Sequence, residues 1–188
     1  MSDKQTQLIE AAIDLFAKEG FWNTPTSKIA KHAGVATGTL FNYFESKNDL
    51  IDAVYLQLKH EWSTHIMTGI TEDQAFKAVT EHMWFRFIDW GINNPVRYTL
   101  MMQLKISNLV SQEAQRRQEE EMAVGLALVQ KGIADGIIGD VDPDYYGRVL
   151  IAQLEASVAY AMKHQLKDMA LTKHITKGFD LFWDGVSK

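Results

Sequence analysis

Only three prolines interrupt this chain of 188 residues, at positions 25, 95 and 143. Proline lacks a backbone donor and clashes with the preceding helical turn, so it is tolerated at the start of a helix and seldom inside one. Each of these prolines stands where a helix can begin or where two helices can be separated. The stretches between them are therefore free to be helical.

Apolar residues recur at three- and four-residue spacing along most of the chain, which is typical of amphipathic helices. Residues 4–18 carry one such stripe with Leu8, Ala12 and Leu15, and Gly20 follows as a natural stop. The same pattern predicts further helices over residues 71–92, 96–110, 111–136, 143–166 and 171–186. No strand-like alternation competes with it, so the sequence predicts an all-α fold.

Two short helices are predicted between residues 24 and 46. Thr24 and Pro25 form a cap and first-turn pair for a helix of about eight residues, and Gly34 ends it. A second short apolar pattern follows, and then Ser46 to Asp49 match a capping box before a long stripe. Two short helices joined by a tight turn are typical of a helix-turn-helix, whose second helix can enter the major groove of DNA.

The composition of the second short helix favours contact with DNA. Thr37, Gly38 and Thr39 are small enough to let the backbone come close to a duplex. Residues 25–47 contain three lysines and one glutamate, whereas the whole chain has a formal net charge of −5. From this pattern alone, a helical hairpin with a solvated polar face remains the alternative interpretation.

The stretch TPTSKIAKHAGVATGTLFNYFESKNDL, residues 24–50, resembles the N-terminal DNA-binding signature of the tetracycline-repressor (TetR) family, and the similarity extends over about residues 8–52. The resemblance implies an N-terminal three-helix DNA-binding unit with a helix-turn-helix, residues 1–48. It implies a C-terminal helical domain for effector binding and dimerisation, residues 49–188. It also implies a homodimeric transcription regulator, usually a repressor.

Site residues follow from the resemblance by position. The expected DNA-binding residues are Thr26, Ser27 and Lys28 from the first short helix, Thr37, Gly38, Thr39 and Asn42 facing the groove, and Tyr43 and Lys47 on phosphates. Three positions depart from the family's pattern. Ala36 stands where a capping serine is frequent, Ser27 where a basic residue is common, and Phe41 where a tyrosine often occurs. These departures motivate the alternative that the chain is a helical ligand-binding or protein-interaction module that has lost DNA binding.

Large side chains concentrate in the central part of the chain and predict an apolar effector pocket, with packed core as the alternative for each. The residues concerned are Trp62, Phe76, Met83, Trp84, Phe87, Ile88, Trp90, Met101 and Met102. Arg86 and Asp89 are expected to pair with each other or to orient a polar group of the effector. A dimer interface is predicted from two apolar faces, with packing inside one chain as the alternative. Its residues are Ala152, Ala156, Ala159, Ile175, Phe179 and Phe182.

Other classes of protein are disfavoured. The absence of cysteine excludes disulfides, thiolate nucleophiles and cysteine-ligated zinc. His60 and His65 are five residues apart, so they miss the spacing of four that a helical zinc-protease motif requires. We therefore expect no enzyme activity, no cofactor and no metal site. Apolar runs are too short to span a bilayer, and the N-terminus lacks the blocks of a signal peptide. The expectation is a cytoplasmic protein whose partners are a double-stranded DNA operator, a small-molecule effector and a second copy of itself, with no membrane.

Overall fold

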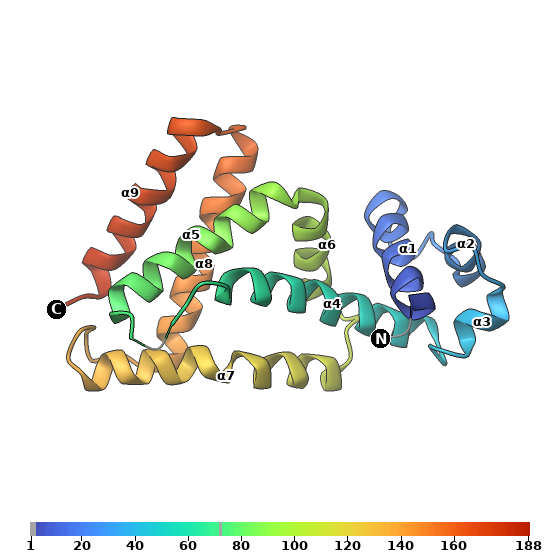
Figure 1. Ribbon diagram of the computed structural model, residues 1–188, viewed down its shortest axis with the longest axis horizontal. Helices are drawn as coiled ribbons and strands as arrows, with labels where there is room; N and C mark the ends of the chain where they lie inside the picture. Colours follow the sequence, from blue (N-terminus) through green and yellow to red (C-terminus); the bar gives the residue numbers. More distant parts are fainter. Residues whose placement is uncertain (1–2, 72) are drawn as a thin grey trace. The chain divides into compact units, whose positions relative to one another are not determined.

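The computed structural model describes residues 3–71 and 73–188, apart from the side chains of residues 121–124. In this part of the chain the regular elements are helices, which confirms the all-α prediction (Figure 1). They are α1 (Asp3–Glu19), α2 (Thr26–His32), α3 (Thr37–Phe41), α4 (Lys47–Met67), α5 (Phe76–Asn93), α6 (Pro95–Ile106), α7 (Gln112–Ala134), α8 (Pro143–Lys163) and α9 (Asp168–Val186). Among the helices so described, none combines the length and the apolar character needed to cross a membrane.

Several helix ends lie where local chemistry predicts them. Gly20 follows α1 with a φ of +82°, a left-handed conformation that glycine adopts without steric cost. The capping box before α4 is confirmed, because Ser46 N donates to Asp49 Oδ2 at 2.8 Å and Asp49 N donates to Ser46 Oγ at 3.3 Å. Asp142 Oδ1 accepts from Tyr145 N at 2.9 Å and so caps α8.

Thr24 has a different role from the predicted one. The residue that caps α2 is Pro25, in an extended conformation and without a side-chain cap. Thr24 is fully buried, and its hydroxyl donates to the carbonyl of Gly20 at 2.8 Å. The hydroxyl therefore satisfies a free carbonyl at the end of α1 instead of a free N–H at the start of α2.

The chain divides into two compact units. The first comprises Met1–Glu61 and Asn94–Gln118. In it α1 packs against both α2 and α6, and α2 packs against α3. Leu8, Ile13 and Phe16 of α1 are almost completely buried, so the apolar stripe predicted for this helix forms the core of the unit. The division follows packing; the functional boundary at residue 48 stays a prediction.

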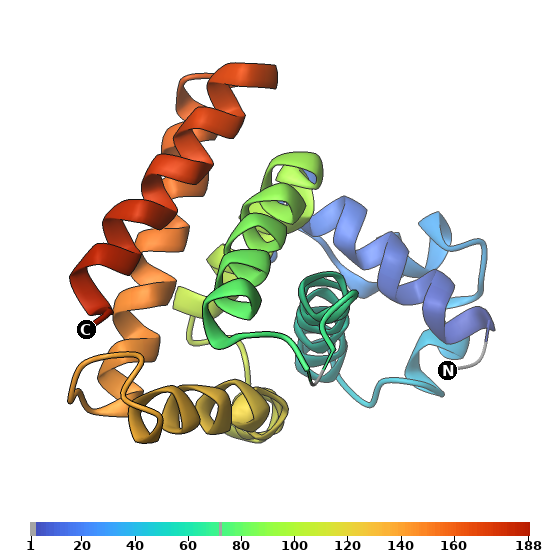
Figure 2. The same cartoon turned by 60° about the vertical axis from the view of Figure 1, so that its left-hand side comes forward.

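The second unit comprises Trp62–Asn93 and Glu119–Lys188. Its α8 and α9 lie side by side, and α5 packs against both (Figures 1 and 2). Trp84 of α5 stands at the centre of this core: its ring stacks on Phe182 with centroids 5.6 Å apart, and its indole N–H donates to the carbonyl of Ile175 at 3.1 Å. A large aromatic cluster therefore holds these three helices together.

Candidate nucleic-acid interface

The two short helices α2 and α3 are held in a fixed arrangement by their turn. Gly34 has a φ of +72°, and Val35 N donates to the carbonyl of Ala30 at 2.9 Å. Leu40, on the inner side of α3, is completely buried, and Phe44 just beyond the helix is also buried. These anchors leave the opposite side of α3 on the surface, which is the geometry of a helix-turn-helix.

The predicted groove-facing residues lie on or next to this free side. Thr37 and Gly38 are exposed and Thr39 is half-buried. A methyl group added at Gly38 would meet no atom within 4 Å, so the surface over this residue is open. Asn42 is exposed and follows the last residue of α3 as its C-terminal cap. The structure thus brings Thr37, Gly38, Thr39 and Asn42 to one short segment accessible from outside.

Lys47 has contacts inside the protein as well as a predicted role on phosphate. Its ammonium group donates to the carbonyl of Phe21 and lies 5.9 Å from the ring centroid of Phe16. Partial burial lowers the pKa of Lys47. An ammonium has three N–H donors, so the bond to Phe21 leaves donors for a phosphate oxygen. Tyr43, the other predicted phosphate contact, is exposed.

The residues predicted from the first short helix lie at the start of α2. Thr26 is half-buried, whereas Ser27 and Lys28 are exposed. Lys28 Nζ forms an ion pair with Glu19 at 2.6 Å, a contact between α2 and the end of α1. Part of the positive charge that the sequence assigns to this surface is therefore neutralised within the protein.

Two residues without a local sequence signal stand out in the first unit. Trp22, in the turn between α1 and α2, is 81% exposed. Arg97 of α6 donates to Glu61 Oε2 of α4 at 3.0 Å and also to Glu10 of α1. Residues 22–23 carry no periodic signal, and the partners of Arg97 are 36 and 87 positions away. No local pattern could have revealed either feature.

The predicted effector-pocket residues are mostly packed. Six of them are buried in the second unit, namely Trp62, Phe76, Trp84, Phe87, Ile88 and Trp90, and Met83 is half-buried there. The other two belong to the first unit, where Met101 is buried and Met102 is half-buried. Trp62 meets Phe87 edge-on with centroids 5.4 Å apart. In the described residues this cluster has the features of a core. An open hollow of about 440 Å³ lies elsewhere, lined by Gln130, Ile133 and residues 140–143.

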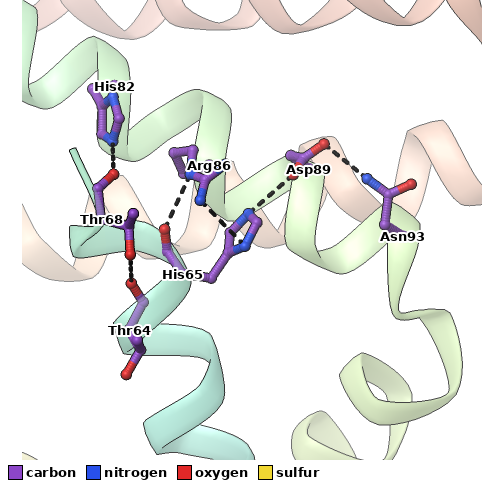
Figure 3. A network of polar contacts seen from close by, with 7 residues as sticks. All are labelled: Thr64, His65, Thr68, His82, Arg86, Asp89 and Asn93. Carbon is purple, nitrogen blue, oxygen red and sulfur yellow. Dashed lines mark hydrogen bonds and ion pairs between the residues drawn. The ribbon is translucent and has the colours of Figure 1, made fainter.

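Arg86 and Asp89 both bind His65 of α4, which replaces the predicted pairing between them (Figure 3). Asp89 Oδ2 lies 2.9 Å from His65 Nε2, and Arg86 Nε donates to the carbonyl of His65 at 3.0 Å. Asp89 also accepts from Asn93 at 2.8 Å. Arg86 and Asp89 therefore join α5 to the last turn of α4 through His65.

The predicted dimer residues fall into two sets. Ala152, Ala156 and Ala159 of α8 are exposed. Ile175, Phe179 and Phe182 of α9 are buried inside the chain, which corresponds to the alternative of packing within one chain. Phe179 and Phe182 pack against Trp84, and the backbone of Ile175 accepts its indole N–H. The core within one chain already uses this face of α9.

A helix-turn-helix with an exposed second helix, built on an all-helical chain, defines a DNA-binding transcription regulator. The sequence model of the bacterial regulatory proteins of the tetR family matches residues 8–54. The match assigns these N-terminal residues, which include the helix-turn-helix, to this family.

Two curated relatives are similar to the chain in sequence. The fatty acid metabolism regulator protein of Bacillus subtilis is 34% identical over 74 residues, 39% of this chain and 38% of that protein. The HTH-type transcriptional regulator BetI of Escherichia coli is 25% identical over 157 residues, 70% of this chain and 80% of BetI. The first similarity therefore covers well under half of the relative's length, and the second covers most of it.

Two solved structures show the fold over nearly the whole chain. A tetR family transcription regulator from Shewanella sp. PV-4 is 26% identical and superposes with a TM-score of 0.89, covering 100% of both chains. The transcriptional regulator FadR from Bacillus subtilis, solved in complex with stearoyl-CoA, is 20% identical with a TM-score of 0.78, covering 96% of this chain and 98% of FadR. The latter likeness establishes the fold alone.

Proposed function

We propose that this regulator binds a short palindromic operator as a homodimer and represses transcription until a small apolar or amphipathic effector releases it. In this proposal each subunit inserts α3 into the major groove. Two recognition helices about one DNA turn apart then contact the two halves of the site. The protein acts in the cytoplasm, where its DNA target is, and its role is regulation and not catalysis.

The observation that carries the proposal is the exposed face of α3 and its rigid support. Thr37 and Gly38 are open to solvent, while Leu40 on the other side is fixed in the core. An amide side chain such as that of Asn42 can pair with adenine, and threonine methyl groups can contact thymine. Thr39 and Asn42 are therefore the proposed determinants of operator sequence.

Phosphate contacts set affinity and position the protein on the duplex. The hydroxyl of Tyr43 and the ammonium of Lys47 are proposed for this role, together with Thr26, Ser27 and Lys28 at the start of α2. Because Lys28 is paired with Glu19, DNA has to compete with that carboxylate for its charge. We therefore expect Lys28 to contribute less than an unpaired lysine would.

An apolar or amphipathic effector is supported by what two relatives are called. One is a fatty acid metabolism regulator, and the FadR structure contains stearoyl-CoA. In this chain the second unit supplies a large aromatic core around Trp84, into which such a molecule would have to open a cavity. An effector that binds one conformation of the dimer better than the other shifts the population of DNA-competent dimers.

The dimer surface is proposed on α8. Ala152, Ala156 and Ala159 are exposed at helical spacing, and small side chains let two helices approach closely. Tyr145 and Tyr160 of the same helix and Leu181 of α9 add large exposed apolar side chains. Exposed apolar area of this kind is expected of a surface that a second copy covers.

The test begins with selection of duplexes from a random 30-base-pair library, followed by mobility shift over a salt series. We expect one palindromic sequence to be enriched, because base contacts discriminate. Thr39→Ala and Asn42→Ala should change which sequence is selected. Tyr43→Phe should weaken binding to selected and mismatched duplexes by the same factor, because a phosphate contact carries no sequence information.

The effect of Lys47→Ala on DNA binding is harder to interpret, because Lys47 also donates a hydrogen bond to the carbonyl of Phe21. Its thermal unfolding has to be measured beside its DNA binding. Loss of one phosphate contact reduces the slope of log affinity against log salt concentration by about one. Selection that enriches no sequence, with the wild type unable to shift any duplex at low salt, would overturn the proposal in favour of a module without DNA binding.

A further inference from the structure

Trp22 differs from every other tryptophan of the chain. It is 81% exposed, whereas Trp62, Trp84, Trp90 and Trp183 are each at most 8% exposed. Tryptophan carries a large apolar surface together with an N–H donor, and for this reason it is enriched at interfaces. The exposed indole is therefore a candidate for contact with a partner.

The turn that carries Trp22 is rigid. Phe21 is buried and meets Phe16 edge-on at 5.3 Å, and Thr24 is buried with its hydroxyl on the carbonyl of Gly20. Asn23 Nδ2 donates to the carbonyl of Glu19 at 3.1 Å. Both neighbours of Trp22 are thus fixed to α1, so the indole is held outside by a preorganised backbone and does not lie on a loose loop.

The surroundings of Trp22 suit an anion. Lys47 donates to the carbonyl of Phe21, which places its ammonium one residue from Trp22 along the chain. Between residues 18 and 47 there are four lysines and two glutamates and no other formally charged side chain, in a protein whose formal net charge is −5. Two residues after Asn23, Pro25 caps α2, whose first turn faces DNA in the proposed function. The partner that fits this charge is a nucleic acid backbone.

We propose that Trp22 packs against the sugar-phosphate backbone of the bound duplex, beside the phosphates that Tyr43 and Lys47 contact. The indole N–H donates to a phosphate oxygen, and the ring covers the adjacent deoxyribose. The inference rests on the proposed DNA binding and adds a residue to it. Since the contact involves only the sugar-phosphate backbone of the DNA, it raises the affinity for all DNA sequences alike.

Ser27, a proposed phosphate contact at the start of α2, is a neutral side chain. A donor from the preceding turn adds a contact on a neighbouring phosphate. A neutral donor releases no counterion, so the contribution of Trp22 is independent of salt concentration, unlike that of Lys47.

Tryptophan fluorescence tests the proposal directly, because the other four tryptophans are buried. Acrylamide, a neutral quencher, should quench the free protein mainly through Trp22, and the duplex selected from the random library should protect it. Trp22→Phe should show little quenching with or without DNA, which assigns the signal. Binding of the same duplex, labelled with fluorescein, is followed in parallel by anisotropy.

Affinity supplies the second measurement. Trp22→Ala should weaken binding of both selected and mismatched duplexes by about fivefold or more, with an unchanged salt slope, and Trp22→Phe should weaken it less. Thermal unfolding should not change, because the side chain is exposed. Ile106→Ala is the matched control: Ile106 is an apolar residue of the same unit and is 82% exposed, and its removal should leave the affinity unaltered.

The outcomes separate the two claims. Protection of Trp22 by DNA together with weaker binding of Trp22→Ala supports the contact. Binding by anisotropy without protection, or with full affinity of Trp22→Ala, overturns the contact and leaves the DNA-binding function in place. Failure of the wild type to bind any duplex overturns the function and the contact with it.

Discussion

His65 Nε2 lies 2.9 Å from Asp89 Oδ2, and this contact joins the end of α4 to α5 within the second unit (Figure 3). Arg86 Nη2 lies 3.4 Å from the other ring nitrogen, Nδ1. A guanidinium group can only donate, so Nδ1 has to accept and the ring proton is on Nε2, directed at Asp89. In the neutral form of His65, this arrangement therefore favours one tautomer.

The first prediction concerns Asp89. Asp89→Ala removes the acceptor of both His65 and Asn93, and we expect it to lower the free energy of unfolding by about 0.5–1 kcal/mol, a modest value because the carboxylate is partly solvated. Urea unfolding followed by circular dichroism measures the loss. In nitrogen-15 NMR the neutral histidine should show a protonated Nε2 in the wild type, and the Nε2 signal should shift in the variant because its acceptor is gone. A protonated Nδ1 in the neutral wild-type ring would contradict the assigned tautomer.

Arg97 is the subject of the second prediction. It joins α1, α4 and α6 through Glu10 and Glu61. Burial alone would lower the pKa of Arg97, but the hydrogen bond to Glu10 and the charges of both glutamates outweigh it and raise the pKa. Arg97→Ala leaves two carboxylates without their shared cation, and we expect a loss of about 1–2 kcal/mol of stability. Arg97→Lys should recover only part of this stability, because an ammonium lacks the planar guanidinium group that reaches two carboxylates at once.

The control for Arg97 is Arg148, which pairs with Asp144 at 2.7 Å on an exposed face of α8. Arg148→Ala should leave the urea midpoint unchanged, because water screens such a pair. Equal effects of the two substitutions would show that the three-helix contact at Arg97 is no stronger than an ordinary surface ion pair.

Tyr146 gives a prediction with a defined pH dependence. Its side chain is 2% exposed, and its hydroxyl has no hydrogen-bond partner among the described residues. Burial raises the pKa of Tyr146 to about 12. Because the unfolded chain ionises near pH 10 and the folded protein does not, stability is complete below pH 10 and falls as the pH rises from about 10 to about 12.

Tyr146→Phe should therefore stabilise the protein at pH 8 and stabilise it further at high pH. At pH 8 the gain is about 1 kcal/mol, from removal of an unsatisfied buried hydroxyl. At pH 11 it increases by about 1.4 kcal/mol, because phenylalanine does not ionise in the unfolded chain. Urea unfolding at both pH values measures the difference, and a gain that does not grow with pH would contradict the burial of this hydroxyl.

The sequence predicted those parts of the fold that depend on neighbours along the chain. Ser46 and Asp49 are three residues apart, and their reciprocal capping bonds were predictable because both partners lie within one turn. Thr24 shows the limit of the same reasoning. A threonine before a proline can cap the following helix or close the preceding one, and only the burial of the turn against α1 selects the second.

The resemblance to a known family predicted which residues of α3 are accessible, whereas their role in DNA binding stays a prediction. Thr37, Gly38 and Asn42 are accessible as expected. The stripe of α9, however, shows only that one face is buried, and periodicity does not say whether a partner subunit or Trp84 of the same chain buries it. Contacts of this kind join residues about a hundred positions apart, which no local pattern encodes.

The last prediction tests the remaining dimer surface. Ala156 of α8 is exposed, so Ala156→Arg should leave the fold of the chain intact, as circular dichroism can verify. If two copies of α8 pack closely here, an arginine on each creates a clash and like-charge repulsion at the interface. Analytical ultracentrifugation should then show a monomer, and operator affinity should fall at least tenfold because one recognition helix is lost. Ala134→Arg, an equally small exposed site on α7, is the control and should remain dimeric. A dimeric Ala156→Arg variant with full operator affinity would place the interface outside this face of α8.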